Sequence, residues 1–246
     1  RPGNERPAWV PPMNDFSDAF WAALRLLADL DPDLLEIVAL SLSVSLSATG
    51  IAALIGLPLG AAVALIRFPG RRAITIFLNA MMGLPPVVVG LVVYMMLSRA
   101  GPLGELGLLF TPTAMVIAQC ILITPIVAAL TRQTVSDLNE EYEEHLRSLG
   151  ADTTQRIATL LWDGRFRLLT AVLAGFGRAV AEVGAVLIVG GNIQHSTRVM
   201  TTTIALETSK GNLAFALGLG LVLVTVAASV NATVTVITDA ASRRYG

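Results

Sequence analysis

The chain has 246 residues, of which 54% are hydrophobic and 14% are charged, and its formal net charge is −1 at pH 7. An ordinary soluble domain has about 25% charged residues, so this chain cannot build a water-facing surface over its whole length and is expected to be integral to a membrane. The near-neutral charge argues against nucleic acid as a partner, and a single cysteine, Cys120, excludes a disulfide framework and a cysteine metal cluster.

The first 33 residues are predicted to precede the membrane-spanning part. Residues 1–15 are polar and rich in proline, which predicts a disordered extension. Residues 16–33 place Phe20, Leu24 and Leu27 at helical spacing among charged residues, and they are too few and too charged to span a bilayer. This segment is expected to be an amphipathic helix that lies along the membrane interface.

Five apolar stretches are long enough to cross a bilayer, for which a helix needs ~20 residues. They cover residues 34–66, 73–97, 112–131, 168–189 and 213–238. The first contains Gly56 and Gly60 at the spacing that permits close helix contact, and the second is broken by Pro85 and Pro86, since proline cannot continue a helix. The predicted fold class is therefore an all-α integral membrane protein with five transmembrane helices.

The positive charges predict how the five spans are oriented. If the chain starts outside, ten of the 17 Lys and Arg residues fall on the cytoplasmic face and six on the other, with Arg178 inside the fourth span. Cytoplasmic loops carry the excess of positive charge, so we expect an external N-terminus and a cytoplasmic C-terminus. The connection at residues 136–163 then faces the cytoplasm.

That connection is predicted to be a helix, a turn and a second helix. Residues 140–149 contain no Pro or Gly, and Gly150 follows them as a C-terminal stop, which calls for a left-handed backbone. Asp152 can cap the second helix. From these residues alone, a solvated connector and a docking element remain equally open.

The chain lacks the residues for chemistry of its own. The single lysine, Lys210, follows Ser209 rather than Gly, so the sequence contains no phosphate-binding loop, and any ATP hydrolysis is expected from a partner. The two histidines, His145 and His195, are predicted on opposite sides of the membrane. We expect no enzyme activity, no bound cofactor and no metal site in this chain.

Arg178 and Glu182 lie one helical turn apart within the fourth predicted span. Each alone would cost ~2.5–3.5 kcal/mol at the centre of a membrane helix, and as a pair they can neutralise each other. One interpretation is a structural ion pair. The other is that Arg178 helps an anion along a translocation path, with Glu182 preventing tight capture.

Residues 144–151, Glu-His-Leu-Arg-Ser-Leu-Gly-Ala, resemble the coupling loop of binding-protein-dependent ABC importer permeases. The family's pattern is Glu-Ala-Ala, then three residues of any type, then Gly. Glu144, the spacing and the Gly-Ala pair at residues 150–151 fit this pattern, whereas His145 and Leu146 stand in place of its two alanines. In the family this short helix docks into a groove on an ATPase subunit. The resemblance therefore implies a set of coupling residues. These are Glu143, Glu144, Leu146, Leu149, Gly150 and Ala151.

Residues 177–185, 189–193, 197–202 and 205–212 resemble the fourth span and following external loop of tungstate permease subunits, and residues 83–90 resemble their second span. Molybdate and sulfate permeases share the Arg-Ala-x-x-Glu-x-Gly core and differ more in the loop. The resemblance marks Arg178, Glu182, Pro85 and Pro86 as candidate path residues. In the external loop it marks Asn192, Thr197, Arg198 and Glu207, although residues 198–207 also fit an interfacial helix.

The resemblance implies a homodimeric permease in the cytoplasmic (inner) membrane of a prokaryote. Its partners would be two ATPase subunits that bind ATP and Mg, and a periplasmic or lipid-anchored oxyanion-binding protein. Tungstate is the favoured substrate, with molybdate and sulfate as alternatives. The competing class is a secondary transporter or channel driven by an ion gradient, for which Glu182 is the best feature and the odd span count without an inverted repeat is unfavourable.

Overall fold

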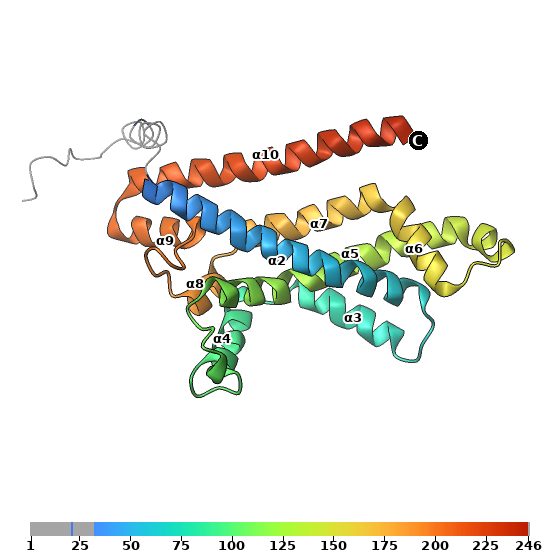
Figure 1. The fold of residues 1–246 in the computed structure, drawn as a ribbon, viewed down its shortest axis with the longest axis horizontal. Helices are drawn as coiled ribbons and strands as arrows, with labels where there is room; N and C mark the ends of the chain where they lie inside the picture. Colours follow the sequence, from blue (N-terminus) through green and yellow to red (C-terminus); the bar gives the residue numbers. More distant parts are fainter. Residues whose placement is uncertain (1–20, 22–31, 246) are drawn as a thin grey trace, which may run out of the picture.

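The computed structural model describes Trp21 and residues 32–245, with side chains described up to Val236 (Figure 1). The predicted extension at residues 1–15 lies outside the described residues, as does nearly all of the predicted interfacial helix at residues 16–33. Two residues of that segment, Pro32 and Asp33, belong instead to the first long helix.

The described part of the chain is built from helices. They are α2 (Pro32–Leu65), α3 (Arg71–Met82), α4 (Pro86–Leu97), the short 3-10 helix η1 (Gly104–Leu106), α5 (Pro112–Ser148), α6 (Thr153–Asp163), α7 (Arg165–Val180), α8 (Gly184–Gly190), α9 (Met200–Lys210) and α10 (Leu213–Tyr245).

Three of these helices, α2, α5 and α10, are long and apolar enough to cross a membrane. Two further pairs qualify only when each is taken as one broken span: α3 with α4, bent by 101°, and α7 with α8, bent by 57°. The structure is thus consistent with an all-α membrane protein. The predicted count of five spans holds only if each bent pair is one span.

Helices α2 and α5 form the centre of the fold and run side by side in the same direction (Figure 1). Their contact depends on small residues, as the spacing of Gly56 and Gly60 predicts. A Cβ atom added to Gly56 would lie 3.0 Å from Cβ of Val127, and one added to Gly60 would overlap with the main-chain oxygen of Ala128. The two backbones can approach this closely only because these side chains are absent.

The third predicted span is much shorter than the helix that contains it. Helix α5 does not end near residue 131 but continues to Ser148, so the predicted cytoplasmic helix is its last part. The reason is that no Pro or Gly interrupts the chain between Pro125 and Gly150, and the change from apolar to polar residues alters the surroundings without altering the backbone.

The turn after α5 has the predicted form. Gly150 adopts a left-handed backbone with φ 72°, and the N–H of Ala151 donates to the carbonyl of Leu146 at 3.1 Å, which closes a Schellman motif. Asp152 then caps α6 in a reciprocal capping box with Gln155, whose N–H lies 2.7 Å from the Asp152 carboxylate. Local chemistry therefore sets this turn.

Candidate functional site

The fourth apolar stretch is interrupted at residues 181–183, between α7 and α8. Glu182 lies in this interruption and is only 3% exposed. Gly184, the first residue of α8, approaches α4 so closely that an added Cβ would lie 2.9 Å from Cγ2 of Val87. Since Val87 follows Pro86, the break between α3 and α4 lies next to the break between α7 and α8.

The Glu182 carboxylate and main chain are satisfied by three separate elements. Its Oε1 accepts a hydrogen bond from the N–H of Ala185 in α8 at 3.0 Å, and its main-chain carbonyl accepts one from the Thr201 hydroxyl in α9 at 2.8 Å. Oε2 lies 2.7 Å from Nη1 of Arg178 in α7, a charge contact rather than an aligned hydrogen bond. A buried carboxylate requires such compensation.

The predicted ion pair between Arg178 and Glu182 is present, but its setting differs from the expectation. The two residues do not lie on one continuous helix, because α7 ends at Val180 and Glu182 already serves the start of α8. Arg178 is one-third exposed, whereas the Glu182 side chain is 2% exposed. These contacts favour the structural interpretation of the pair.

Polar side chains gather beside Glu182 around a small cavity. Its lining includes Ser41, Ser45, Gln119 and Thr201. Gln119 donates to the carbonyl of Ala179 at 3.1 Å, and its own side-chain oxygen is buried without a hydrogen-bond partner among the described residues. The cavity measures about 10 Å³, the size of one water, so this conformation is closed to a tetrahedral oxyanion.

Two of the external-loop residues singled out in the sequence hold the loop together. Thr197 is 1% exposed; its hydroxyl donates to the carbonyl of Gly190 at 2.5 Å and accepts from the N–H of Ile193 at 3.0 Å. The Asn192 side chain accepts a hydrogen bond from Thr202 at 2.9 Å. Both side chains therefore serve the internal packing of the loop.

The helix expected at residues 198–207 is present as α9, which begins at Met200 and ends at Lys210. Its first turn is buried: Met200 is 1% exposed, and its N–H donates to the hydroxyl of Ser41 in α2 at 2.7 Å. The segment is therefore anchored in the protein at its N-terminal end, because its early side chains pack on α2 and α10.

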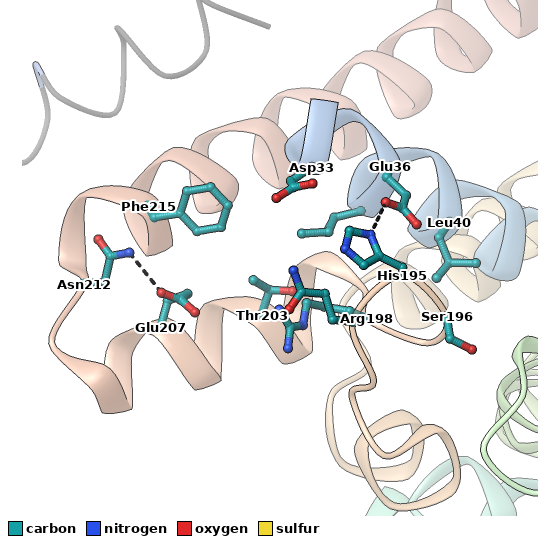
Figure 2. Close-up of a pocket in the computed structure, with 12 residues that line it drawn as sticks. Asp33, Glu36, Leu40, His195, Ser196, Arg198, Thr203, Glu207, Asn212 and Phe215 are labelled. Carbon is teal, nitrogen blue, oxygen red and sulfur yellow. Dashed lines mark hydrogen bonds and ion pairs between the residues drawn. The ribbon is translucent and has the colours of Figure 1, made fainter. Parts of the chain in front are cut away.

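The other two external-loop residues, Arg198 and Glu207, line a cavity of about 230 Å³ (Figure 2). The same cavity contains three residues that sequence reasoning missed as a group, Asp33, Glu36 and His195. Nδ1 of His195 lies 2.8 Å from Oε2 of Glu36. This contact joins residues 159 positions apart, so no local pattern could have identified it.

Two side chains of this cavity, His195 and Glu207, have shifted pKa values. The hydrogen bond to Glu36, together with its negative charge, raises the pKa of His195. The hydrogen bond from Lys210, at 2.9 Å, lowers the pKa of Glu207, and a second bond from Asn212 acts in the same direction. Both shifts favour the charged form of the residue at neutral pH.

The predicted coupling residues divide into two groups at the C-terminal end of α5. Glu143 and Leu146 face α6: Glu143 lies 3.9 Å from Arg156, and Leu146 packs against the cluster that holds α6 on α5. Glu144, Leu149 and Gly150 are exposed, and Ala151 is half-buried. Leu149 is 75% exposed, and Trp162, which sequence reasoning did not select, is 69% exposed.

The sequence profile described as "Binding-protein-dependent transport system inner membrane component" matches residues 56–246. The chain belongs to this family. The resemblance drawn from its sequence is thereby confirmed, and membership together with the apolar helices makes it a multi-pass inner membrane component of a transport system.

Named relatives of this inner membrane component are permease proteins for anions. The tungstate uptake system permease protein TupB of Peptoclostridium acidaminophilum is 43% identical, over 84% of this chain and 91% of the relative. TupB of Campylobacter jejuni is 38% identical, over 80% of this chain and 82% of that protein. The sulfate transport system permease protein CysW of Escherichia coli is more distant, at 29% identity over 78% and 67%.

Proposed function

We propose that this chain is the permease subunit of an ATP-driven importer that carries an oxyanion, tungstate, across the cytoplasmic membrane. One observation supports it most directly: identity to two tungstate permeases is 43% and 38%, against 29% to a sulfate permease. Two copies of the chain would work with two ATPase subunits and an external oxyanion-binding protein. The N-terminus would be external and the C-terminus cytoplasmic.

The continuity of α5 supports coupling to a partner ATPase. The sequence contains no G-x-x-x-x-G-K-[ST] phosphate-binding loop, so ATP hydrolysis would be supplied by that partner. Gln119 beside Glu182 and Ser148 at the coupling turn belong to the same helix. At 1.5 Å per residue, about 44 Å of helix joins them, with Pro125 as an internal position where a backbone hydrogen bond is missing. A displacement of Leu149 and Gly150 by a partner ATPase would be carried along α5 toward the polar cavity, and Pro125 is the position at which the helix could bend on the way.

The chemistry around Glu182 suits a path for a dianion. Hydroxyl and amide groups of Ser45, Gln119 and Thr201 can replace water around an oxyanion. Arg178 is neutralised by Glu182, so no unpaired cation would trap the ion. Opening at the adjacent breaks before α4 and α8 would widen the cavity from its closed state.

The test is uptake by proteoliposomes that contain the permease with its ATPase and binding protein. Tungstate should enter only with internal ATP, and molybdate and sulfate should compete weakly. Preference for molybdate or sulfate would change the substrate within the class. Uptake that persists without ATP and stops when an ionophore abolishes the ion gradients would assign the chain to secondary transporters instead.

A further inference from the structure

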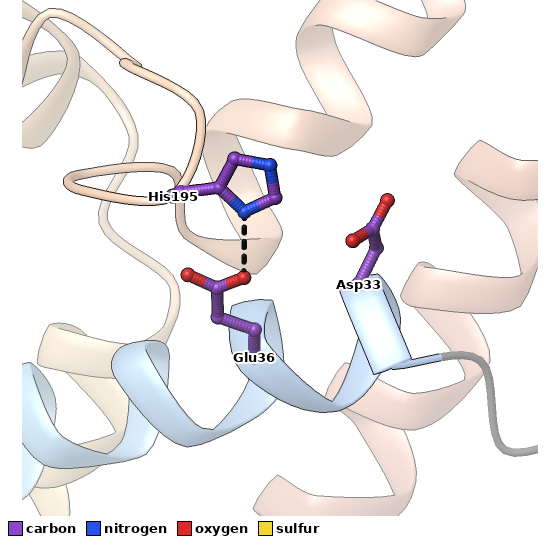
Figure 3. A group of neighbouring side chains, drawn as sticks. All are labelled: Asp33, Glu36 and His195. Carbon is purple, nitrogen blue, oxygen red and sulfur yellow. Dashed lines mark hydrogen bonds and ion pairs between the residues drawn. The ribbon is translucent and has the colours of Figure 1, made fainter.

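Asp33, Glu36 and His195 form a cluster of metal-ligating side chains on the wall of the external cavity (Figure 3). Asp33 and Glu36 lie three residues apart at the start of α2, and His195 comes from the connection between α8 and α9. One donor atom from each residue lies within 4.8 Å of the other two. Two elements distant in the sequence thus converge on one point.

The backbone presents His195 in a fixed way. His195 has a left-handed conformation with φ 57°, which histidine adopts more readily than most residues with a side chain. The turn around it is closed by hydrogen bonds from the N–H groups of Ser196 and Thr197 to the carbonyl of Ile193, at 3.2 and 3.0 Å. The buried Thr197 hydroxyl anchors this turn to Gly190. The imidazole is therefore held toward α2 by the fold of the connection.

The donor set has the chemistry of a divalent transition-metal site. An imidazole nitrogen and two carboxylates are ligands that Zn²⁺ takes at about 2.0–2.2 Å, and three protein ligands leave a fourth position open. Ligand atoms around such an ion would be about 3–3.5 Å apart, so the present spread needs only side-chain rotation. The His195 and Glu36 side chains are 59% and 47% exposed, which leaves them room to rotate.

The charges around the cluster favour a cation over an anion. Among the described residues that line the cavity, the two carboxylates are accompanied by the guanidinium of Arg198, which shares the cavity with Glu207. Glu207 is engaged by Lys210, so it contributes little net charge. An ion bound by Asp33 and Glu36 would displace the proton that Glu36 otherwise stabilises on His195.

We propose that Asp33, Glu36 and His195 bind a divalent transition-metal ion, with Zn²⁺ the best fit, and that the ion fastens the start of α2 to the connection between α8 and α9. The site lies at the end of the molecule opposite to the turn between α5 and α6 (Figure 1). It is independent of which oxyanion is transported. An open coordination position would face the cavity and could accept water or a ligand atom of a docked partner.

The test uses the full chain in detergent, purified through a tag without histidine and stripped with a chelator. Zn²⁺ is titrated against a fluorescent chelator, and Co²⁺ absorption reports the ligand geometry. One equivalent per chain should bind, and His195→Ala and Glu36→Gln should each weaken binding by at least about 10-fold, since each removes a ligand. His145→Ala and Glu140→Gln are matched controls on α5 and should bind normally.

Folding of each variant is checked by gel filtration and helical circular dichroism. If His195→Ala does not fold, Glu36→Gln and Asp33→Asn carry the test, because both keep the size of the side chain. Absence of a stoichiometric Zn²⁺ site in the wild type would overturn the proposal. So would equal affinity in the wild type and the folded cluster variants, which would mean adventitious binding only.

Discussion

Glu182 illustrates, at the scale of one residue, what sequence reasoning can and cannot reach. The spacing from Arg178 predicts their ion pair, which forms at 2.7 Å. The break in the helix between them is not predicted, because no proline marks it. It depends on Gly184 packing against Val87, a contact between segments almost a hundred residues apart that no local pattern records.

The first prediction is that exchanging the charges of Arg178 and Glu182 will not restore stability. Glu182→Gln should keep the hydrogen bond from Ala185 but leave Arg178 unpaired, at a cost of about 1–3 kcal/mol because Arg178 is partly exposed. In the double reversal an arginine would replace the carboxylate that accepts this bond. Thermal unfolding in detergent measures both variants. Wild-type stability in the double reversal would show that charge pairing alone matters at this position.

The second prediction concerns the pH dependence of the contact between His195 and Glu36 in metal-free protein. The pKa of His195 is raised in the folded state by Glu36, with Asp33 acting in the same direction and Arg198 against it. The stabilisation is therefore fully present below the unfolded histidine pKa, about 6.5, and is lost as pH rises through the folded value.

Melting temperatures of the wild type and His195→Gln, measured with chelator between about pH 5.5 and 8.5, check this sign. The advantage of the wild type should be greatest at the acid end and should shrink as pH rises. An advantage that grows with pH would contradict the raised pKa.

At the scale of the elements, local signals located breaks and caps, whereas hydropathy misjudged lengths. Pro85 and Pro86 mark the break before α4, and Asp152 and Gly150 form the predicted cap and turn. Hydropathy located an apolar stretch at residues 112–131 but not the end of α5 at Ser148, because hydropathy does not register where the hydrogen bonds of a helix stop.

The third prediction tests the contact between α2 and α5 with one chemical change at two positions. Gly60→Ala should destabilise the protein by about 1–3 kcal/mol, since the new Cβ would overlap with Ala128 and lie 2.7 Å from Cβ of Thr131. Gly50→Ala lies in the same helix with nothing within 4 Å, so it should be neutral or stabilise by up to about 1 kcal/mol. Equal melting temperatures for the two variants would contradict the close packing.

At the scale of the whole molecule, two long helices each join two distant regions. Helix α5 links the turn at Gly150 to the cavity beside Glu182, and α2 links the close contact at Gly60 to the cluster at Glu36. Composition and the length of the apolar stretches were sufficient to predict a membrane protein built from helices. The meeting of the two helix breaks and the cavity at His195 required long-range packing, which composition and periodicity do not contain.

The last prediction concerns the turn at Gly150. Two matched variants, Gly150→Val and Gly211→Val, separate a loss of function from the effect of backbone strain. Gly150 has φ 72° and Gly211 has φ 80°, and a Cβ on either would meet nothing within 4 Å. Valine at either position should thus cost a similar ~1–2 kcal/mol. Gly150 lies beside the exposed Leu149, whereas Gly211 follows α9 at the other end of the protein.

If the turn at Gly150 transmits ATPase closure, Gly150→Val should lose most ATP-dependent tungstate uptake while the folded permease still inserts. Gly211→Val should retain that uptake. Glu144→Lys, on the exposed face of the same helix end, should reproduce the loss through weaker contact with the ATPase. Proteoliposomes in which retained ATPase, hydrolysis rate and uptake are measured together distinguish these cases. Equal uptake in the two glycine variants would mean that the turn is only a solvated connector, because strain alone would then account for every effect.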